Sequence, residues 1–236
     1  MIPSIVLKKK NPKIFTIHIQ DPKVSFKNFD TIIAPEHDNL NGDNVYSSKG
    51  AIHYITEPEI KKAEPYLFNK IKSHKLVSLI LGGPNKYYSF DKDQLIEIFN
   101  EIRSNFIAKG YKVIVIPSKR TPKMIIDLAI KEFIADGYVV SSVDKESYLS
   151  AFALATNIVV TCDSTSMISE ATTSGKPIFV AHMKAKKNNY RFKKFFRLFK
   201  EMGITRDFGD QVESWTYNKL NEATRIAALI NSKLKN

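Results

Sequence analysis

The chain has 236 residues, of which 43% are hydrophobic and 11% aromatic. That is enough apolar surface for one large domain or two modest ones, each with a buried core. Lys and Arg number 36 against 24 Asp and Glu, and the net charge of +12 favours anionic partners such as nucleotides, nucleic acid or an acidic membrane surface. A genomic bias toward lysine explains the same excess equally well.

The sequence also limits the compartment in which the protein works. Cys162 is the only cysteine, which excludes a disulfide framework and a four-cysteine zinc site and suits a reducing cytoplasm. The segment 1–13 has a short apolar patch followed by lysines, the reverse of a secretory signal. No run approaches 18 apolar residues, so we expect no transmembrane helix. We therefore predict a cytoplasmic protein and leave open a peripheral contact with the inner membrane.

The first 72 residues predict an incomplete α/β lobe. Segments 13–20 and 30–35 have the composition of strands, and 56–72 is a polar helical segment suited to linking two lobes. Two strands do not make a stable doubly wound domain. We expect this lobe, with its linker, to occupy 1–72 and either to be truncated or to lean on the rest of the chain.

From residue 73 to residue 236 the pattern predicts a doubly wound, parallel α/β domain of the Rossmann-like class. Five Val- and Ile-rich runs without alternation predict buried parallel strands: 75–81, 111–117, 137–142, 157–162 and 176–181. Amphipathic or capped segments between and after them predict helices: 91–110, 121–134, 146–155, 184–203 and 217–234. Strands that alternate with helices in this way imply crossover connections and a parallel sheet.

The segment "DSTSMISEATTSG" (163–175) follows one of these strands and offers groups that bind phosphate and ribose. Ligands bind at the carboxyl ends of parallel strands, and a helix start there provides N–H groups and a partial positive charge. Ser164, Thr165 and Ser166 add hydroxyl donors, and Glu170 lies one turn farther along, where it can accept hydrogen bonds from a ribose diol. An N-cap serine with a solvent-facing glutamate is the alternative that the spacing leaves open.

Two further strand ends carry glycine or polar loops. In "LGGPNK" (81–86), Gly82 and Gly83 allow a close approach of backbone to phosphate, with Asn85 beside them, although a tight turn explains the pair as well. The segment lacks the third glycine of the dinucleotide-binding fingerprint and is not a P-loop. In "PSKRTP" (117–122), Ser118 and Arg120 can hold an anion. Because parallel strands bring these ends to one edge, the loops together are more persuasive than any one of them.

The motif "PEHD" (35–38) places Glu36, His37 and Asp38 after a strand of the N-terminal lobe. This cluster has the chemistry for proton transfer, and a surface turn is the alternative. Metal dependence is unsupported, because "DKD" (91–93) is better interpreted as a helix cap and there is no clustered set of ligands. No RNA- or DNA-binding motif accompanies the positive charge, so nucleic acid is not an expected partner.

Several motifs, in this order, resemble the family of the plant mitochondrial-fission "elongated mitochondria" protein and its bacterial relatives: "IHIQDP", "FDTIIAPEHD", "GDNVYSSKGAIHYIT", "LGGPNKYYSFD", "PSKRTP" and "VTCDSTSMISEATTSGKPIFV". The resemblance covers nearly the whole chain. It implies a GT-B glycosyltransferase-like fold of two Rossmann-like lobes, with the acceptor side in 1–72 and the nucleotide-sugar-binding domain in 73–236. It also implies that Ser164 and Ser166 hold a diphosphate, that Glu170 holds the ribose, and that Gly82 and Gly83 lie near the phosphates.

By this resemblance the substrate is a nucleotide-diphosphate sugar, with UDP the expected nucleotide, and no cofactor is required. The chain departs from the family at its front, where the glycine-rich loop is missing, so we expect an N-terminal truncation or a second chain that supplies the missing lobe. Whether this chain acts as an enzyme by itself stays open.

Two functions follow from the resemblance. The first is that of a nucleotide-sugar-binding protein, an inverting glycosyltransferase if complete, acting on a cell-envelope or lipid-linked acceptor with His37 or Asp38 as the base. The second is that of a non-catalytic interaction protein of the fission family, whose plant members are implicated in recruiting a dynamin-related protein. It would contact an anionic membrane through the basic, Phe-rich segment 190–203, unless those phenylalanines pack on the sheet.

Overall fold

The computed structural model describes residues 2–209 and 212–235, which belong to two units. The smaller unit comprises residues 1–54 and 221–236, and the larger unit comprises residues 55–220. This division differs from the predicted boundary at residue 72 because helices α2 (Glu57–Ala63) and α3 (Pro65–Ile71) pack against α6 (Lys145–Leu154) of the larger unit. Within the described residues, no helix is both long enough and apolar enough to cross a membrane.

The smaller unit is built on a three-stranded parallel sheet in the order β1-β2-β3. Its strands are β1 (Ile17–Ile19), β2 (Thr31–Pro35) and β3 (Val45–Ser48), and the sequence pattern missed β3. The central strand is the most apolar, with Ile32 and Ile33 almost completely buried. Two 3-10 turns, Phe26–Asn28 and Glu36–Asp38, follow β1 and β2, and helix α1 (Ile2–Lys10) precedes the sheet without burying any residue.

A buried carboxylate places the C-terminal helix α9 (Glu222–Lys235) in the smaller unit. Glu222 accepts a hydrogen bond from the Lys49 backbone N–H at 2.7 Å and is paired with Arg225, whose guanidinium donates to the Ser47 carbonyl at 2.6 Å. These bonds join α9 to β3 and its following turn across more than 170 positions of sequence. Amphipathicity alone could not have shown that this helix leaves the domain that precedes it.

The larger unit contains a six-stranded parallel sheet in the order β6-β5-β4-β7-β8-β9, with all five predicted strands present. The strands are β4 (Leu76–Leu81), β5 (Lys112–Pro117), β6 (Gly137–Val139), β7 (Asn157–Thr161), β8 (Ile178–Ala181) and β9 (Thr205–Asp207). The strand β9 was not predicted, because its three residues Thr-Arg-Asp carry no apolar run. Its position beside β8 is decided by pairing rather than by composition.

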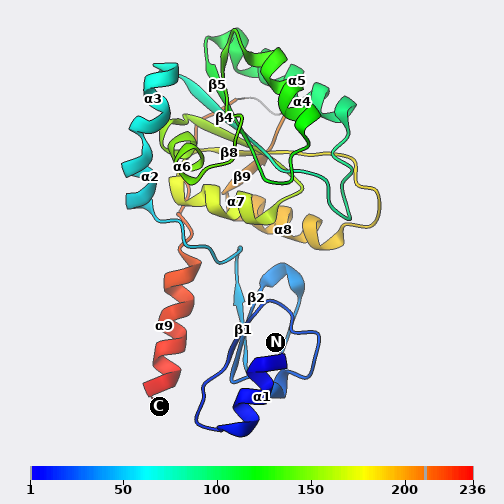
Figure 1. Cartoon of the computed structure of the whole chain (residues 1–236), viewed down its shortest axis with the longest axis vertical. Coiled ribbons are helices and arrows are strands. Elements are labelled where there is room, and N and C mark those ends of the chain that lie inside the picture. Colours follow the sequence, from blue (N-terminus) through cyan, green and yellow to red (C-terminus); the bar gives the residue numbers. More distant parts are fainter. Residues whose placement is uncertain (1, 210–211, 236) are drawn as a thin grey trace. The chain divides into compact units, whose positions relative to one another are not determined.

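Helices cover both faces of this sheet, as a doubly wound fold requires (Figure 1). One face packs against α4 (Lys92–Asn105) and α5 (Lys123–Phe133), which bury Phe99 and Phe133 there. The opposite face packs against α2, α3, α6, α7 (Thr165–Ala171) and α8 (Tyr190–Glu201). Because all six strands are parallel, the loops that follow them emerge at one edge, where the functional site is expected.

Candidate functional site

The carboxylate of Asp163 joins the loops that follow three adjacent strands. Asp163 lies two residues past β7, and its side chain is fully buried. Its Oδ2 accepts hydrogen bonds from the Gly83 N–H and from the Arg120 guanidinium, both at 2.9 Å, and its Oδ1 accepts from the Thr161 hydroxyl at 2.7 Å. Gly83 follows β4 and Arg120 follows β5, so the structure brings together the strand ends that the sequence analysis singled out.

The two glycines after β4 are required because these loops touch. A Cβ atom on Gly82 would lie 2.1 Å from an Asp163 carboxylate oxygen, and one on Gly83 would lie 2.2 Å from the Arg120 carbonyl oxygen. The Gly82 N–H donates to the Thr161 hydroxyl at 2.8 Å, and the Gly83 N–H donates to Asp163. Both amides are therefore hydrogen-bonded inside the protein, and the role that the geometry shows for these glycines is close packing of the loops.

Burial raises the pKa of Asp163 above its ordinary value, and the hydrogen bonds from Gly83 and Thr161 and the charge of Arg120 offset this effect only in part. The Arg120 guanidinium also donates to the Gly83 carbonyl at 2.6 Å, and 41% of its side chain is exposed. Arg120 is thus both half of a buried ion pair and a cation that reaches the surface at the edge of the sheet.

Asn85 and Ser118 shape the same loops through hydrogen bonds to the backbone. The Asn85 amide donates to the Asp163 carbonyl at 3.0 Å, and its Oδ1 accepts from the backbone N–H groups of the next two tyrosines. The Ser118 hydroxyl accepts from the Arg120 backbone N–H at 3.3 Å, and the Ser118 N–H donates to the Thr121 hydroxyl at 2.8 Å. These polar side chains, which were predicted to contact a ligand, hold the turn conformations.

Helix α7 begins beside Asp163 and presents the predicted hydroxyl groups. Ser164 is the N-cap and accepts from the Met167 N–H at 3.4 Å, so the N-cap interpretation holds for this residue. Thr165 and Ser166 form the first two helical positions, and Ser166 is exposed. Glu170 is half-buried, and its Oε2 accepts a hydrogen bond from the Tyr148 hydroxyl of α6 at 2.6 Å. The alternative of a simple solvent-facing glutamate therefore does not hold.

The Glu36, His37 and Asp38 cluster lies in the 3-10 turn after β2, in the smaller unit. Only 6% of the His37 and Asp38 side chains is exposed, and His37 Nε2 lies 3.5 Å from Asp38 Oδ1. Glu36 forms a 2.6 Å ion pair with Lys49. Because the histidine and the aspartate are buried together, this segment is not an ordinary surface turn. The cluster belongs to the smaller unit, whereas the strand-end residues belong to the larger unit.

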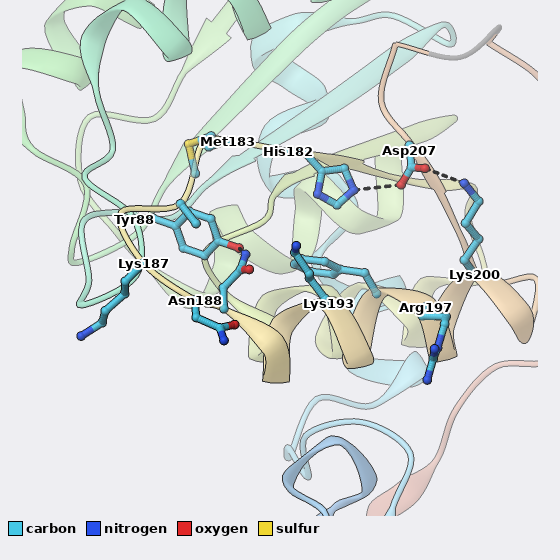
Figure 2. Close-up of a pocket in the computed structure, with 12 residues that line it drawn as sticks. Tyr88, His182, Met183, Lys187, Asn188, Lys193, Arg197, Lys200 and Asp207 are labelled. Atoms are coloured by element: carbon cyan, nitrogen blue, oxygen red, sulfur yellow. Dashed lines mark hydrogen bonds and ion pairs between the residues drawn. The ribbon is translucent and has the colours of Figure 1, made fainter.

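A hollow of about 890 Å³ opens at the carboxyl ends of β8 and β9 and was not predicted. His182 follows β8 directly, and its Nε2 lies 2.8 Å from an oxygen of Asp207, the last residue of β9. Lys200 of α8 pairs with the other oxygen of Asp207 at 2.5 Å, as Figure 2 shows. Burial acts to raise the pKa of Asp207, but the bonds from Lys200 and His182 outweigh it, so this pKa lies below its ordinary value.

The sequence contained one signal for this hollow, a histidine immediately after an apolar strand. Its partner Asp207 lies 25 residues farther along, in a strand too short and polar to be recognised.

The phenylalanines of α8 pack inside the larger unit. Phe195 and Phe199 are completely buried, while Phe192 stacks edge-on against Tyr88 at 5.3 Å and Phe196 against His182 at 5.0 Å. This agrees with the packing interpretation of these four side chains. The membrane contact through 190–203 stays a prediction.

Across residues 2–209 and 212–235, no three His, Cys, Asp or Glu side chains gather in a way that could hold a metal ion. The donors at the sheet edge are hydroxyl groups, amides and cations, which suit anionic ligands.

Comparison with known proteins identifies relatives over nearly the whole chain. The family model described as "Mitochondrial fission ELM1" matches residues 1–234. A protein of Rickettsia prowazekii described as uncharacterized is 28% identical, and the alignment covers 97% of this chain and 75% of that protein. The mitochondrial fission protein ELM1 of Arabidopsis thaliana is 26% identical over 99% of this chain and 61% of that protein, so the chain spans less than two thirds of the plant protein's length.

Among solved structures, the UDP-GlcNAc 2-epimerase of Methanocaldococcus jannaschii is similar with a TM-score of 0.52. The alignment covers 97% of this chain and 73% of that chain at 12% identity. At that identity the likeness shows the fold alone, which is of the GT-B type expected from the sequence.

Proposed function

We propose, since this chain belongs to the mitochondrial fission ELM1 family, that its larger unit binds a nucleotide sugar at the carboxyl edge of its six-stranded sheet. The observation that carries the proposal is the convergence of three strand-end loops on Asp163, directly beside the hydroxyl-rich start of α7. Ligands of open α/β sheets bind at this edge. The GT-B-type fold, which this chain has in common with an enzyme named for a UDP-sugar, supports the choice of ligand class.

Glu170 is the residue proposed to hold the ribose. It lies in the second turn of α7, and the Tyr148 hydroxyl orients its carboxylate through a 2.6 Å hydrogen bond. An ionised carboxylate has about four acceptor positions, so a hydrogen bond from tyrosine is compatible with bonds from the two hydroxyl groups of a ribose. A carboxylate whose rotamer is held by a neighbour binds with less loss of side-chain entropy than a freely rotating one.

The start of α7 is proposed to receive the diphosphate. Ser164, Thr165 and Ser166 supply hydroxyl groups there, next to backbone N–H groups at the positive end of the helix. Arg120 adds a guanidinium that is partly exposed beside the same edge. Gly82, Gly83, Asn85 and Ser118 then act by positioning, because their hydrogen bonds hold the loops in place.

The experiment is calorimetric titration of the full chain with UDP and with UDP-GlcNAc, for the native protein and for Glu170→Gln. Each hydrogen bond to a charged group contributes about 1.5–3 kcal/mol, so the loss of one ribose contact weakens binding roughly ten- to a hundredfold. Glu97→Gln on the exposed face of α4 is the matched control and should bind like the native protein. Absence of binding by every nucleoside diphosphate would refute the proposal and favour the non-catalytic interaction protein instead.

Glycosyl transfer is a further step that this titration does not address. The prediction that His37 or Asp38, with Glu36, serves as the acceptor base stays a prediction. Its support is the geometry of the buried pair, in which His37 Nε2 lies 3.5 Å from an oxygen of the Asp38 carboxylate. His37→Gln should abolish any transfer activity while leaving the affinity for UDP unchanged, and an unchanged rate would rule the base out.

A further inference from the structure

The hollow at the ends of β8 and β9 has a wall of positive charge. Lys193, Arg197 and Lys200 recur at intervals of four and three residues along one side of α8, and Lys187 adds a fourth cation from the loop before this helix. Among the described residues that line the hollow, Asp207 is the only carboxylate, and both of its oxygens are engaged by His182 and Lys200. The surplus of cations over carboxylates makes the hollow attractive to a multiply charged anion.

Part of the wall that α8 does not form is apolar. Tyr88, Met183 and Ala185 line it, and the first two are labelled in Figure 2. Tyr88 is 1% exposed, its hydroxyl accepts from the Asn189 side-chain amide at 2.8 Å, and it pairs with Ala185 in an isolated β-bridge. A preformed apolar wall together with a cationic one fits a ligand that carries a charged group on a ring or hydrocarbon body.

This hollow is lined by none of the residues proposed to hold the nucleotide sugar. The two regions are neighbours, because the Met183 N–H of the hollow contacts the Cys162 sulfur at 3.2 Å and Cys162 precedes Asp163. The nucleotide site uses the ends of β4, β5 and β7, whereas the hollow uses the ends of β8 and β9. A second ligand bound here would therefore lie along the same edge of the sheet as the first.

We propose that the hollow at the ends of β8 and β9 is a second site, which binds a phosphate- or diphosphate-bearing ligand separate from the nucleotide sugar. A phosphate group matches it because the group carries up to two negative charges and three acceptor oxygens, which lysine and arginine neutralise and bond. Its volume of about 890 Å³ has room for a phosphorylated ring or chain rather than for a phosphate ion alone. The inference goes beyond the proposed function and does not require it.

The test is calorimetric titration of the full chain with inorganic pyrophosphate at low ionic strength. The double variant Lys193→Gln/Arg197→Gln removes two cations of the hollow, and both side chains are exposed, so the fold should persist. The control double variant Lys123→Gln/Arg191→Gln removes the same charges from exposed positions outside the hollow. We expect the first to weaken pyrophosphate binding about tenfold or more and the control to change it less than about twofold.

Equal weakening by both double variants would overturn the proposal, because it would mean that net charge rather than the hollow attracts the anion. Displacement by saturating UDP of the pyrophosphate whose binding depends on Lys193 and Arg197 would also overturn it, since UDP would then occupy the hollow itself. Failure of UDP to bind concerns the nucleotide proposal only, because the pyrophosphate titration is made without UDP.

A vesicle arm distinguishes a lipid source of the phosphate from a soluble one. Phosphatidylcholine vesicles with and without phosphatidic acid are sedimented with the native chain and with both double variants. Retention on phosphatidic acid that depends on Lys193 and Arg197 identifies a lipid headgroup, and pyrophosphate binding without such retention identifies a soluble phosphorylated compound. If neither probe binds in a manner that depends on these two residues, the hollow is not a phosphate site.

Discussion

Removal of the Arg120 guanidinium tests whether Asp163 is the centre of the strand-end loops. In Arg120→Met the side chain keeps much of its length but no longer pairs with the buried carboxylate. Breaking one partner of a fully buried ion pair costs about 3–5 kcal/mol. Here 41% of the arginine side chain is exposed, and Gly83 and Thr161 still bond to the carboxylate, so we expect a smaller loss of about 2 kcal/mol.

The loss should depend on pH in a defined direction. Burial raises the pKa of Asp163 in the folded protein above its unfolded value, so the stability that this group contributes is present at low pH and lost as pH rises through the folded value. Without Arg120 the pKa rises further, and the ionised carboxylate becomes more costly. The difference in unfolding free energy between native protein and variant should therefore be largest at neutral pH and shrink as pH falls through the folded pKa values of Asp163, which lie above the ordinary carboxyl value.

Urea unfolding followed by tryptophan fluorescence measures this difference. Trp215 is the only tryptophan and packs on Phe179 of β8, so its emission reports the larger unit. Arg103→Met is the matched control, because Arg103 is 39% exposed like Arg120 but pairs with carboxylates that are partly in water. It should cost about 1 kcal/mol or less from its ion pairs. Equal losses for the two variants, or a loss at Arg120 that does not vary with pH, would refute the reasoning.

Three further outcomes follow from the packing and charges of the larger unit. Gly83→Ala should destabilise it by about 1–3 kcal/mol, because the new Cβ would lie 2.2 Å from the Arg120 carbonyl oxygen. In the control Gly110→Ala the new Cβ meets nothing within 4 Å, and the variant should lose only about 1 kcal/mol because of the positive φ at this position. Equal urea midpoints for the two variants would contradict this prediction. Phe199→Ala should cost about 3–5 kcal/mol in the same assay, since its side chain is fully buried, and a loss below about 1 kcal/mol would mean that α8 does not pack as described. The pKa of Asp207 is lowered in the folded state, so this carboxylate should stabilise the fold at pH values above the ordinary carboxyl pKa. That stabilisation should disappear as pH falls through the folded pKa. Asp207→Asn should therefore show a smaller loss of unfolding free energy on acidification than the native protein.

The regular elements of the larger unit could be predicted because their signals are local. The strands β4, β5, β7 and β8 are short Val- and Ile-rich runs buried on both faces, and such runs have few other stable environments. The strand β9 and the smaller unit's β3 carry no such run and are strands only because a neighbour pairs with them. For the same reason α9 could be predicted as a helix, but its place in the smaller unit could not, since its anchoring bonds to β3 are non-local.

The candidate site likewise has features that could be predicted from local sequence and features that could not. The sequence by itself determined that polar and glycine-rich loops follow parallel strands, and hence that they meet at one edge of a sheet. Only the tertiary structure decided what those loops do there, because Gly83 and Asp163 are 80 residues apart and His182 and Asp207 are 25 apart. Two hydrogen-bonding groups can be assigned to each other, or to a ligand, only when their distance is known, and composition along a chain does not contain that distance.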